Sequence, residues 1–158
     1  MLIDEIKSKF PPVHWGTKEG KCRIAFDLDE TLGTAITDSN SIIGFNIRSG
    51  CVELLNELKQ HYQLVLWTAS QRSYLDKILS FGLNQYFSET YSWDEIPETW
   101  KDIRIIKVEY LIDDNLHQLE FAAAHQLEHH YIIIPAYGSK EDNHDPLLWT
   151  TIIKHVLL

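Results

Sequence analysis

Two aspartates one residue apart follow an apolar run near the start of the chain, in the segment Ile24-Ala25-Phe26-Asp27-Leu28-Asp29-Glu30-Thr31-Leu32. Side chains alternate along a strand, so Asp27 and Asp29 would share one face if the backbone stayed extended. Two like charges this close are costly to bury unless a cation lies between them. Mg²⁺ prefers carboxylate and carbonyl oxygens and would remove that conflict. On this motif alone, a strand that runs into an acidic turn is an equally good explanation.

Two further apolar runs also end in polar residues. Residues 64–67 are short and continuously apolar and are followed by Thr68-Ala69-Ser70, and residues 108–112 are followed by Asp113-Asp114-Asn115. In parallel sheets, ligands bind beyond the carboxyl ends of the strands. Three chemically compatible strand ends therefore favour an active site at that edge over an incidental acidic turn.

These residue types suit phosphoryl transfer. A carboxylate beside Mg²⁺ can attack phosphorus and form an acyl-phosphate, which splits one difficult hydrolysis into two easier steps. The metal and a lysine would neutralise the transferring oxygens. A threonine hydroxyl and backbone N–H groups at a helix N-terminus would bind the remaining oxygens. A second carboxylate would protonate the leaving oxygen and then activate water.

The elements that must position these groups alternate along the chain. Strands are predicted at residues 22–28, 64–67, 108–112 and 131–134, with a short one near 89–92. Helices are predicted at residues 50–60 and around Leu75 and Ile78, ending at Gly82. A third helix is predicted over residues 116–127, with Leu116, Leu119, Ala123 and Leu127 buried. The last helix is predicted to begin at Asp145-Pro146, with Leu148, Ile152 and Val156 buried. Ile3, Ile6 and Phe10 predict a short amphipathic helix before Pro11-Pro12.

This alternation predicts an α/β fold: a three-layer, Rossmann-like parallel sheet with helices on both faces. Ile43, Phe45 and Ile47 alternate as in a small hairpin, so the interval 33–48 predicts a minimal cap consisting of a small flap only. The length of 158 residues predicts a single domain over residues 1–158.

The composition indicates the cellular compartment and limits the kinds of partner that the protein is expected to bind. No run approaches the roughly 18 apolar residues of a membrane span, and the first ten residues have no signal-peptide core. Cys22 and Cys51 form neither a disulfide framework nor a metal-ligand spacing, which favours a reducing cytoplasm. A net charge of −9 argues against extensive nucleic-acid binding. The phosphoryl-transfer chemistry makes a phosphorylated substrate, such as a phosphorylated protein, the expected partner.

The chain resembles the haloacid dehalogenase superfamily of phosphohydrolases. Asp27-Leu28-Asp29-Glu30-Thr31-Leu32 is similar to its motif I, residues 64–68 to motif II, and Leu111-Ile112-Asp113-Asp114 to motif IV. Within the superfamily it most resembles the small C-terminal-domain phosphatases, or NLI-interacting-factor-like family, through Arg48-Ser49-Gly50, Trp67-Thr68-Ala69-Ser70 and Lys101-Asp102-Ile103. The resemblance covers roughly residues 22–115, with Ser49 in place of the family's usual proline and a shortened interval after Lys101.

The resemblance implies a role for each matching residue. Asp27 would be the nucleophile and Asp29 the general acid and base, while Thr68 and Ala69 would bind the phosphoryl group. The Mg²⁺ ligands would be Asp27, the backbone carbonyl of Asp29, and Asp113 or Asp114.

The lysine that neutralises the phosphoryl group is either Lys101 or Lys107. Lys107 directly precedes the strand predicted at 108–112, so it should lie at the far edge of the sheet. A five-residue strand spans about 16 Å, which is more than a lysine side chain reaches. We therefore predict Lys101, with one or two helical turns between it and the strand.

The small flap also bears on the substrate. Superfamily members that act on small metabolites usually carry a cap domain, so an open site implies a large substrate such as phosphoserine or phosphothreonine in a protein. Alternatives are a nucleic-acid end or small-metabolite phosphatase, a phosphomutase, or a non-catalytic module that binds proteins. The last predicts loss of a catalytic group, yet all are present. Several other polar or aromatic residues are interpreted as structural or solvent-exposed rather than functional. They are His125, His129, His130, Trp93, Trp100, Trp149 and the segment 140–145.

Overall fold

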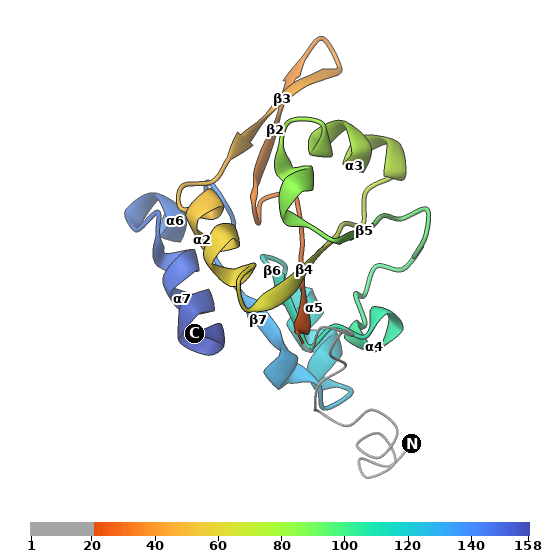
Figure 1. The fold of residues 1–158 in the computed structure, drawn as a ribbon, viewed down its shortest axis with the longest axis vertical. Coiled ribbons are helices and arrows are strands. Elements are labelled where there is room, and N and C mark those ends of the chain that lie inside the picture. The colour runs from red at the N-terminus through yellow and green to blue at the C-terminus, as the bar shows by residue number, and fades with distance from the viewer. Residues whose placement is uncertain (1–20) are drawn as a thin grey trace.

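The computed structural model describes residues 21–158 and shows a five-stranded sheet with the strand order β5-β4-β1-β6-β7 (Figure 1). The strands are β1 (Cys22–Phe26), β4 (Tyr62–Trp67), β5 (Glu89–Tyr91), β6 (Tyr110–Asp113) and β7 (Tyr131–Ile133). All four pairings are parallel, which confirms the predicted Rossmann-like α/β fold. The helix predicted near Ile3, Ile6 and Phe10 lies outside the described residues.

Helices cover both faces of this sheet because its buried strands are apolar on both sides. Ile24 and Phe26 belong to one core with α2 (Cys51–Leu58), α3 (Arg72–Leu79) and α7 (Leu148–Leu157). Ala25 belongs to the other, with α4 (Ile103–Ile106) and α5 (Leu116–Ala123). The remaining helical elements of the described residues are α6 (Lys140–His144), η1 (Leu83–Tyr86) and η2 (Glu128–His130). None of the helices formed by residues 21–158 is long and apolar enough to cross a membrane.

In two helices the buried residues differ in part from those predicted. In α7 the buried apolar residues are Trp149, Ile153 and Leu157, whereas Val156 is exposed, because the Trp149 indole N–H donates to the Ser49 carbonyl at 3.0 Å. In α5 Gln118 and Ala122 are buried while Leu116 and Ala123 are exposed. Of the other residues predicted to be buried here, Leu119 is partly buried and Leu127, after the helix end, is buried. The apolar periodicity predicted this helix but not the inward position of Gln118, because Gln118 is polar.

The start of the last helix was also predicted wrongly. Asp145 is the residue after α6, and α7 begins only at Leu148. The segment 140–145, expected to be a solvated loop, is mostly helical because the Ser139 hydroxyl accepts a hydrogen bond from the Asp142 N–H at 3.3 Å. Gly82 likewise does not end α3, which stops at Leu79, but precedes η1.

The predicted flap is an antiparallel hairpin of β2 (Gly33–Asp38) and β3 (Ser41–Ile47), which projects from the body of the molecule in Figure 1. Ser39 and Asn40 at its tip have positive φ angles of 49° and 70°, as in a tight two-residue hairpin turn. At its base, a Cβ on Gly33 would lie 2.1 Å from the Asn46 carbonyl oxygen, so only glycine fits. The hairpin is therefore a short, locally specified insertion between β1 and α2.

A buried ion pair joins the base of the flap to α6. Arg48 Nη2 lies 2.9 Å from Asp142 Oδ1, with the two side chains only 1% and 6% exposed. The same guanidinium donates to the Pro135 carbonyl at 2.6 Å and lies 4.7 Å from the Trp149 ring centre. Arg48 thereby connects the hairpin, the loop after β7 and α7.

We expect Asp142→Asn to lower the free energy of unfolding by about 3–5 kcal/mol, because it leaves the Arg48 charge buried without its partner. Urea denaturation followed by circular dichroism measures the change. The matched control is Glu57→Gln, which breaks a half-exposed pair with Lys154 at 3.3 Å and should cost less than about 1 kcal/mol. A loss in Asp142→Asn no larger than in the control would contradict the structural role of the pair.

Candidate active site

Three carboxylates meet at the carboxyl edge of the sheet. One oxygen each of Asp27, Asp113 and Asp114 lies within 4.8 Å of the others. Asp27 follows β1 directly, and its N–H donates to the Ile112 carbonyl at 2.9 Å, which keeps it beside the end of β6. The acidic ends of β1 and β6, far apart in the sequence, therefore form one cluster.

Lys101 lies between two of these carboxylates. Its Nζ is 2.6 Å from Asp27 Oδ1 and 2.9 Å from Asp113 Oδ2, and the residue is 3% exposed. Its backbone is fixed on both sides: the Lys101 N–H donates to Gln118 Oε1 at 2.8 Å, and the Tyr131 hydroxyl donates to the Lys101 carbonyl at 2.6 Å. The Lys101 backbone is thus held in place by α5 and β7, and its side chain by Asp27 and Asp113.

Lys107 lies elsewhere. It is exposed at the end of α4, and its carbonyl accepts a hydrogen bond from Arg23, which belongs to the first half of β1. The turn between Lys101 and β6 is the single helical turn of α4. The short interval between Lys101 and β6 is therefore long enough for the chain to cross from the carboxyl edge of the sheet to its amino edge.

The cluster carries an excess of buried negative charge. Burial raises the pKa of Asp27, an effect that Lys101 partly offsets. Burial also raises the pKa values of Asp113 and Asp114. Burial alone would lower the pKa of Lys101, but its ion pairs with Asp27 and Asp113 outweigh burial and hold this pKa above its usual value. One ammonium against three carboxylates leaves a donor set that a hard divalent cation fits.

Thr31 is a member of the site to which sequence reasoning assigned no role. Its hydroxyl lies 2.9 Å from Asp27 Oδ2 and 3.1 Å from Asp114 Oδ1, so it can donate to either carboxylate. The chain turns back after Asp27, with the Leu32 N–H donating to the Leu28 carbonyl at 2.9 Å, and this turn brings Thr31 over the cluster. The sequence feature that could have identified Thr31 as a site residue is its position four residues after Asp27.

The side chain of Asp29 points to other partners. β1 ends at Phe26, so the extended backbone that would place Asp29 beside Asp27 does not continue. The Asp29 carboxylate is outside the three-carboxylate cluster and accepts hydrogen bonds from the Tyr74 hydroxyl and, at 3.4 Å, from the Ser70 hydroxyl. Metal binding by its backbone carbonyl stays a prediction.

Thr68 and Ala69 lie at the end of β4. Thr68 is buried, its N–H donates to the Tyr91 carbonyl, and its Oγ1 accepts from the Ser70 N–H at 3.1 Å, which leaves the hydroxyl proton to be donated. Ala69 lines the same pocket as Asp27 and Lys101. At the start of α3 the Arg72 N–H donates to Asp94 at 3.0 Å, whereas Asn115 and Leu116, where α5 begins, line the pocket.

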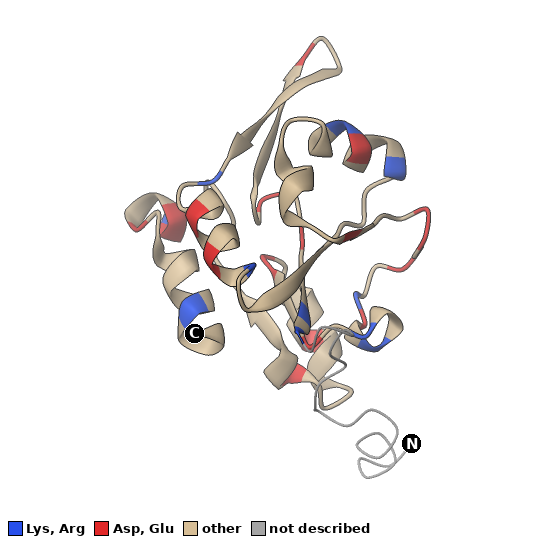
Figure 2. Ribbon diagram, viewed as in Figure 1, with Lys and Arg blue, Asp and Glu red and all other residues tan. Residues whose placement is uncertain are grey.

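The pocket over the carboxylates has a volume of about 590 Å³. It is lined by Asp27, Ala69, Thr99, Lys101, Asp113, Asp114, Asn115, Leu116, His117 and Gln118. Among these lining residues Lys101 is the only lysine or arginine. Nearby, Figure 2 shows acidic residues along the loop between β5 and α4, where Asp94, Glu95 and Glu98 are exposed.

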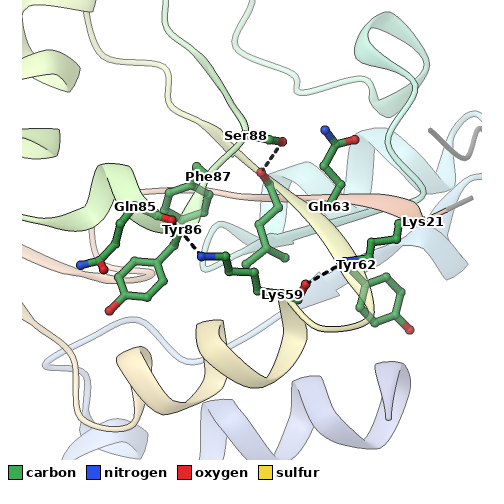
Figure 3. A pocket seen from close by; sticks show the side chains of 9 residues that line it. Lys21, Lys59, Tyr62, Gln63, Gln85, Tyr86, Phe87 and Ser88 are labelled. Atoms are coloured by element: carbon green, nitrogen blue, oxygen red, sulfur yellow. Dashed lines mark hydrogen bonds between the residues drawn. The ribbon is translucent and has the colours of Figure 1, made fainter. Parts of the chain in front are cut away.

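A second pocket, of about 340 Å³, lies at the amino ends of β4 and β5 and contains none of the predicted site residues (Figure 3). Its two lysines donate to backbone carbonyls, Lys59 to Gln85 at 3.1 Å and Lys21 to Lys59 at 3.4 Å. The histidines interpreted as structural make local contacts: His125 stacks on Trp100 at 4.5 Å, and His130 Nδ1 lies 2.9 Å from the Glu109 carbonyl. These features are separate from the carboxylate pocket.

Comparison with solved structures shows the fold independently. The RNA polymerase II CTD phosphatase Fcp1 of fission yeast, as the R271A variant bound to beryllium fluoride, is 13% identical with a TM-score of 0.57 over 86% of this chain. A putative β-phosphoglucomutase from Thermotoga maritima is 13% identical with a TM-score of 0.59 over 86% of this chain and 100% of its own. A haloacid dehalogenase-like hydrolase from Xanthomonas campestris is 14% identical with a TM-score of 0.57, over 87% of this chain and 96% of its own.

The chain spans 44% of the length of the fission yeast protein. Curated protein sequences give no match. The family model described as NLI interacting factor-like phosphatase matches residues 23–155, which include all the candidate site residues from Asp27 to Asp114. The chain therefore belongs to the NLI interacting factor-like phosphatase family.

Proposed function

We propose that this protein is a Mg²⁺-dependent phosphomonoesterase that works through a phosphorylated Asp27. The observation that carries the proposal is the position of Lys101 Nζ, 2.6 Å from Asp27 and 2.9 Å from Asp113 in a buried acidic cluster. A purely structural ion pair would not need a third carboxylate, Asp114, whose oxygen lies within 4.8 Å of the other two. The excess charge fits a site that binds a cation and then a phosphate.

The residues that would hold Mg²⁺ are Asp27, Asp113 and Asp114, together with the Asp29 carbonyl. When bound, the ion would neutralise charge on the carboxylates and on the phosphoryl oxygens. Thr31 supports this arrangement because its hydroxyl contacts Asp27 and Asp114 together. Both Asp113 and Asp114 belong to the cluster, so either can serve as a ligand.

The reaction would proceed in two balanced steps. An Asp27 carboxylate oxygen attacks phosphorus, the bond to the leaving oxygen breaks with its electron pair, and Asp29 gives that oxygen a proton. Asp29 then takes a proton from water, the water oxygen attacks phosphorus, and the acyl-phosphate bond returns its electron pair to Asp27. Lys101 and the Thr68 hydroxyl would bind the phosphoryl oxygens throughout.

The proposed substrate is an exposed phosphomonoester such as phosphoserine or phosphothreonine in a protein. The insertion between β1 and α2 is only the β2–β3 hairpin, and Leu116 and His117 at the pocket's edge are exposed. A nucleic-acid backbone would find no further lysine or arginine among the residues that line this pocket. The carboxylate pocket therefore supports a single phosphate on a large, non-anionic partner.

The first test is hydrolysis of p-nitrophenyl phosphate with Mg²⁺ and with a chelator in its place. We expect turnover only with Mg²⁺, followed by higher kcat/KM for phosphopeptides than for 3′-phosphorylated oligonucleotides or phosphorylated metabolites. No turnover of any of these by the folded protein would favour the non-catalytic module. A preference for oligonucleotides or metabolites would overturn the proposed substrate class alone.

We expect Lys101→Ala to lower kcat by ~10²–10³-fold at saturating Mg²⁺, because one preorganised group that stabilises transition-state charge typically contributes this much. Lys107→Ala is the matched control, since this exposed lysine lies at the other edge of the sheet, and it should retain activity within about threefold. Steady-state kinetics with p-nitrophenyl phosphate measure both. A severe loss in Lys107→Ala with normal activity in Lys101→Ala would reverse the assignment.

A further inference from the structure

Asp29 is held by two side chains that no sequence motif assigned to it. The Tyr74 hydroxyl, on the first turns of α3, donates to Asp29 Oδ1, and the Ser70 hydroxyl lies 3.4 Å from Asp29 Oδ2. A tyrosine hydroxyl carries its proton at neutral pH, and an ionised carboxylate can only accept, so Tyr74 is the donor in this contact. One carboxylate oxygen is therefore tightly bound, and the other has only a long contact.

This asymmetry matters because the two oxygens of a catalytic carboxyl group have different tasks. The oxygen that exchanges a proton with the leaving group must be free, and the other must be fixed so that the group does not rotate. Asp29 itself is only half-buried, on a loop after the end of β1, and the loop alone does not fix its side chain. Tyr74 extends from a helix and supplies that fixed point.

We propose that Tyr74 is the positioning residue for Asp29: its hydroxyl anchors Oδ1, so that Oδ2 exchanges the proton with the leaving oxygen and then with water. The inference rests on the proposed function and adds to it the group that orients the acid. In the first step Oδ2–H gives its proton to the leaving oxygen. In the second step Oδ2 takes a proton from the attacking water, and the Tyr74 proton stays on the phenol throughout.

A second explanation is that Tyr74 simply contacts the substrate. Tyr74 also lines a groove of about 490 Å³ between the hairpin and α3, with Asn40, Ser41, Ile42, Ser73 and Lys77. Loss of a substrate contact would raise KM, whereas loss of an anchor for Asp29 would lower kcat and leave KM nearly unchanged. The two roles therefore separate in steady-state kinetics.

The experiment is a double-mutant cycle of Tyr74→Phe and Asp29→Asn, assayed with a phosphoserine peptide and with p-nitrophenyl phosphate. We expect Tyr74→Phe to lower kcat for the peptide by ~10–100-fold with KM within about threefold, and to slow the first step with p-nitrophenyl phosphate much less. In the Asp29→Asn background the same change should have an effect of less than about twofold, because a group that acts through Asp29 has nothing left to position.

The matched control is Tyr62→Phe, which removes another hydroxyl hydrogen bond, 2.7 Å to the Leu157 carbonyl, far from the carboxylate pocket. It should leave both kinetic parameters unchanged. Additive losses in the double mutant, an effect confined to KM, or Tyr74→Phe activity within twofold of wild type would each overturn the role of Tyr74. Absence of activity in the wild-type protein would instead overturn the proposed function, so the two failures are distinguishable.

Discussion

We expect Asp27→Asn to lower kcat by at least ~10⁴-fold, a barrier increase of about 5 kcal/mol. The amide cannot attack phosphorus, and it is a poorer ligand for a hard cation than a carboxylate. Steady-state hydrolysis of p-nitrophenyl phosphate at saturating Mg²⁺ measures the loss. Residual activity within about tenfold of wild type would rule out Asp27 as the nucleophile.

The variant should remain folded, which makes the result interpretable. Asp27 is one of three clustered carboxylates, and Lys101 keeps its 2.9 Å contact with Asp113 when Asp27 becomes neutral. The matched control is Asp76→Asn, which changes an exposed aspartate on α3 that pairs with Arg72, and should keep full activity. Acid-quenched wild-type protein should also carry phosphate on the peptide that contains Asp27, and the variant should not.

Much of the fold was accessible from the sequence because its strands are short, continuously apolar runs that end in polar residues. Residues 64–67 and Thr68 illustrate this: a strand covered on both faces needs apolar side chains throughout, and the first polar residue marks the edge. The hairpin was predictable from a second local pattern, the alternation of Ile43, Phe45 and Ile47 with other residues. These patterns involve residues that are close together in the sequence, so they can be recognised in a single sequence.

The predictions that were wrong concern contacts between distant segments. Gln118 is buried in α5 because its amide binds the backbone of Thr99 and Lys101, a reason that no apolar periodicity reveals. Trp149 sets the buried face of α7 through Arg48 and Ser49, which lie about a hundred residues earlier. In the candidate site, Thr31 and Tyr74 were assigned no role because their partners become neighbours only when the chain turns after β1.

The orientation of Asp29 is the clearest example of contacts that could not be predicted from the sequence. Spacing alone places Asp27 and Asp29 on one face, but the strand ends between Phe26 and Asp27, and the two carboxylates have different partners. Asp27 contacts Lys101, whereas Asp29 contacts Tyr74 and Ser70. Asp27 lies beside an ammonium group and Asp29 beside two hydroxyl groups, so the surroundings of the two carboxylates are suited to different roles in the proposed reaction.

We therefore expect Asp29→Asn to affect the two steps of the reaction differently. Loss of a general acid and base typically costs ~10²–10⁴-fold, so kcat for a phosphoserine peptide should fall by that factor. With p-nitrophenyl phosphate the leaving phenolate needs little protonation, so the first step should slow by less than about tenfold. Breakdown of the acyl-phosphate still needs a base, and rapid-quench kinetics should show a burst of nitrophenol followed by slow turnover.

Two further measurements separate this role from metal binding. Mg²⁺ affinity, measured by titration calorimetry, should change by less than about threefold in Asp29→Asn, because the Asp29 carboxylate lies outside the Asp27, Asp113 and Asp114 cluster. Glu30→Gln is the matched control, since the Glu30 side chain accepts a hydrogen bond from Thr34 at 3.0 Å and belongs to no step of the reaction. If Asp29→Asn slowed the first step equally for the peptide and for p-nitrophenyl phosphate, Asp29 would not be the acid, and the separate surroundings of the two aspartates would need another explanation.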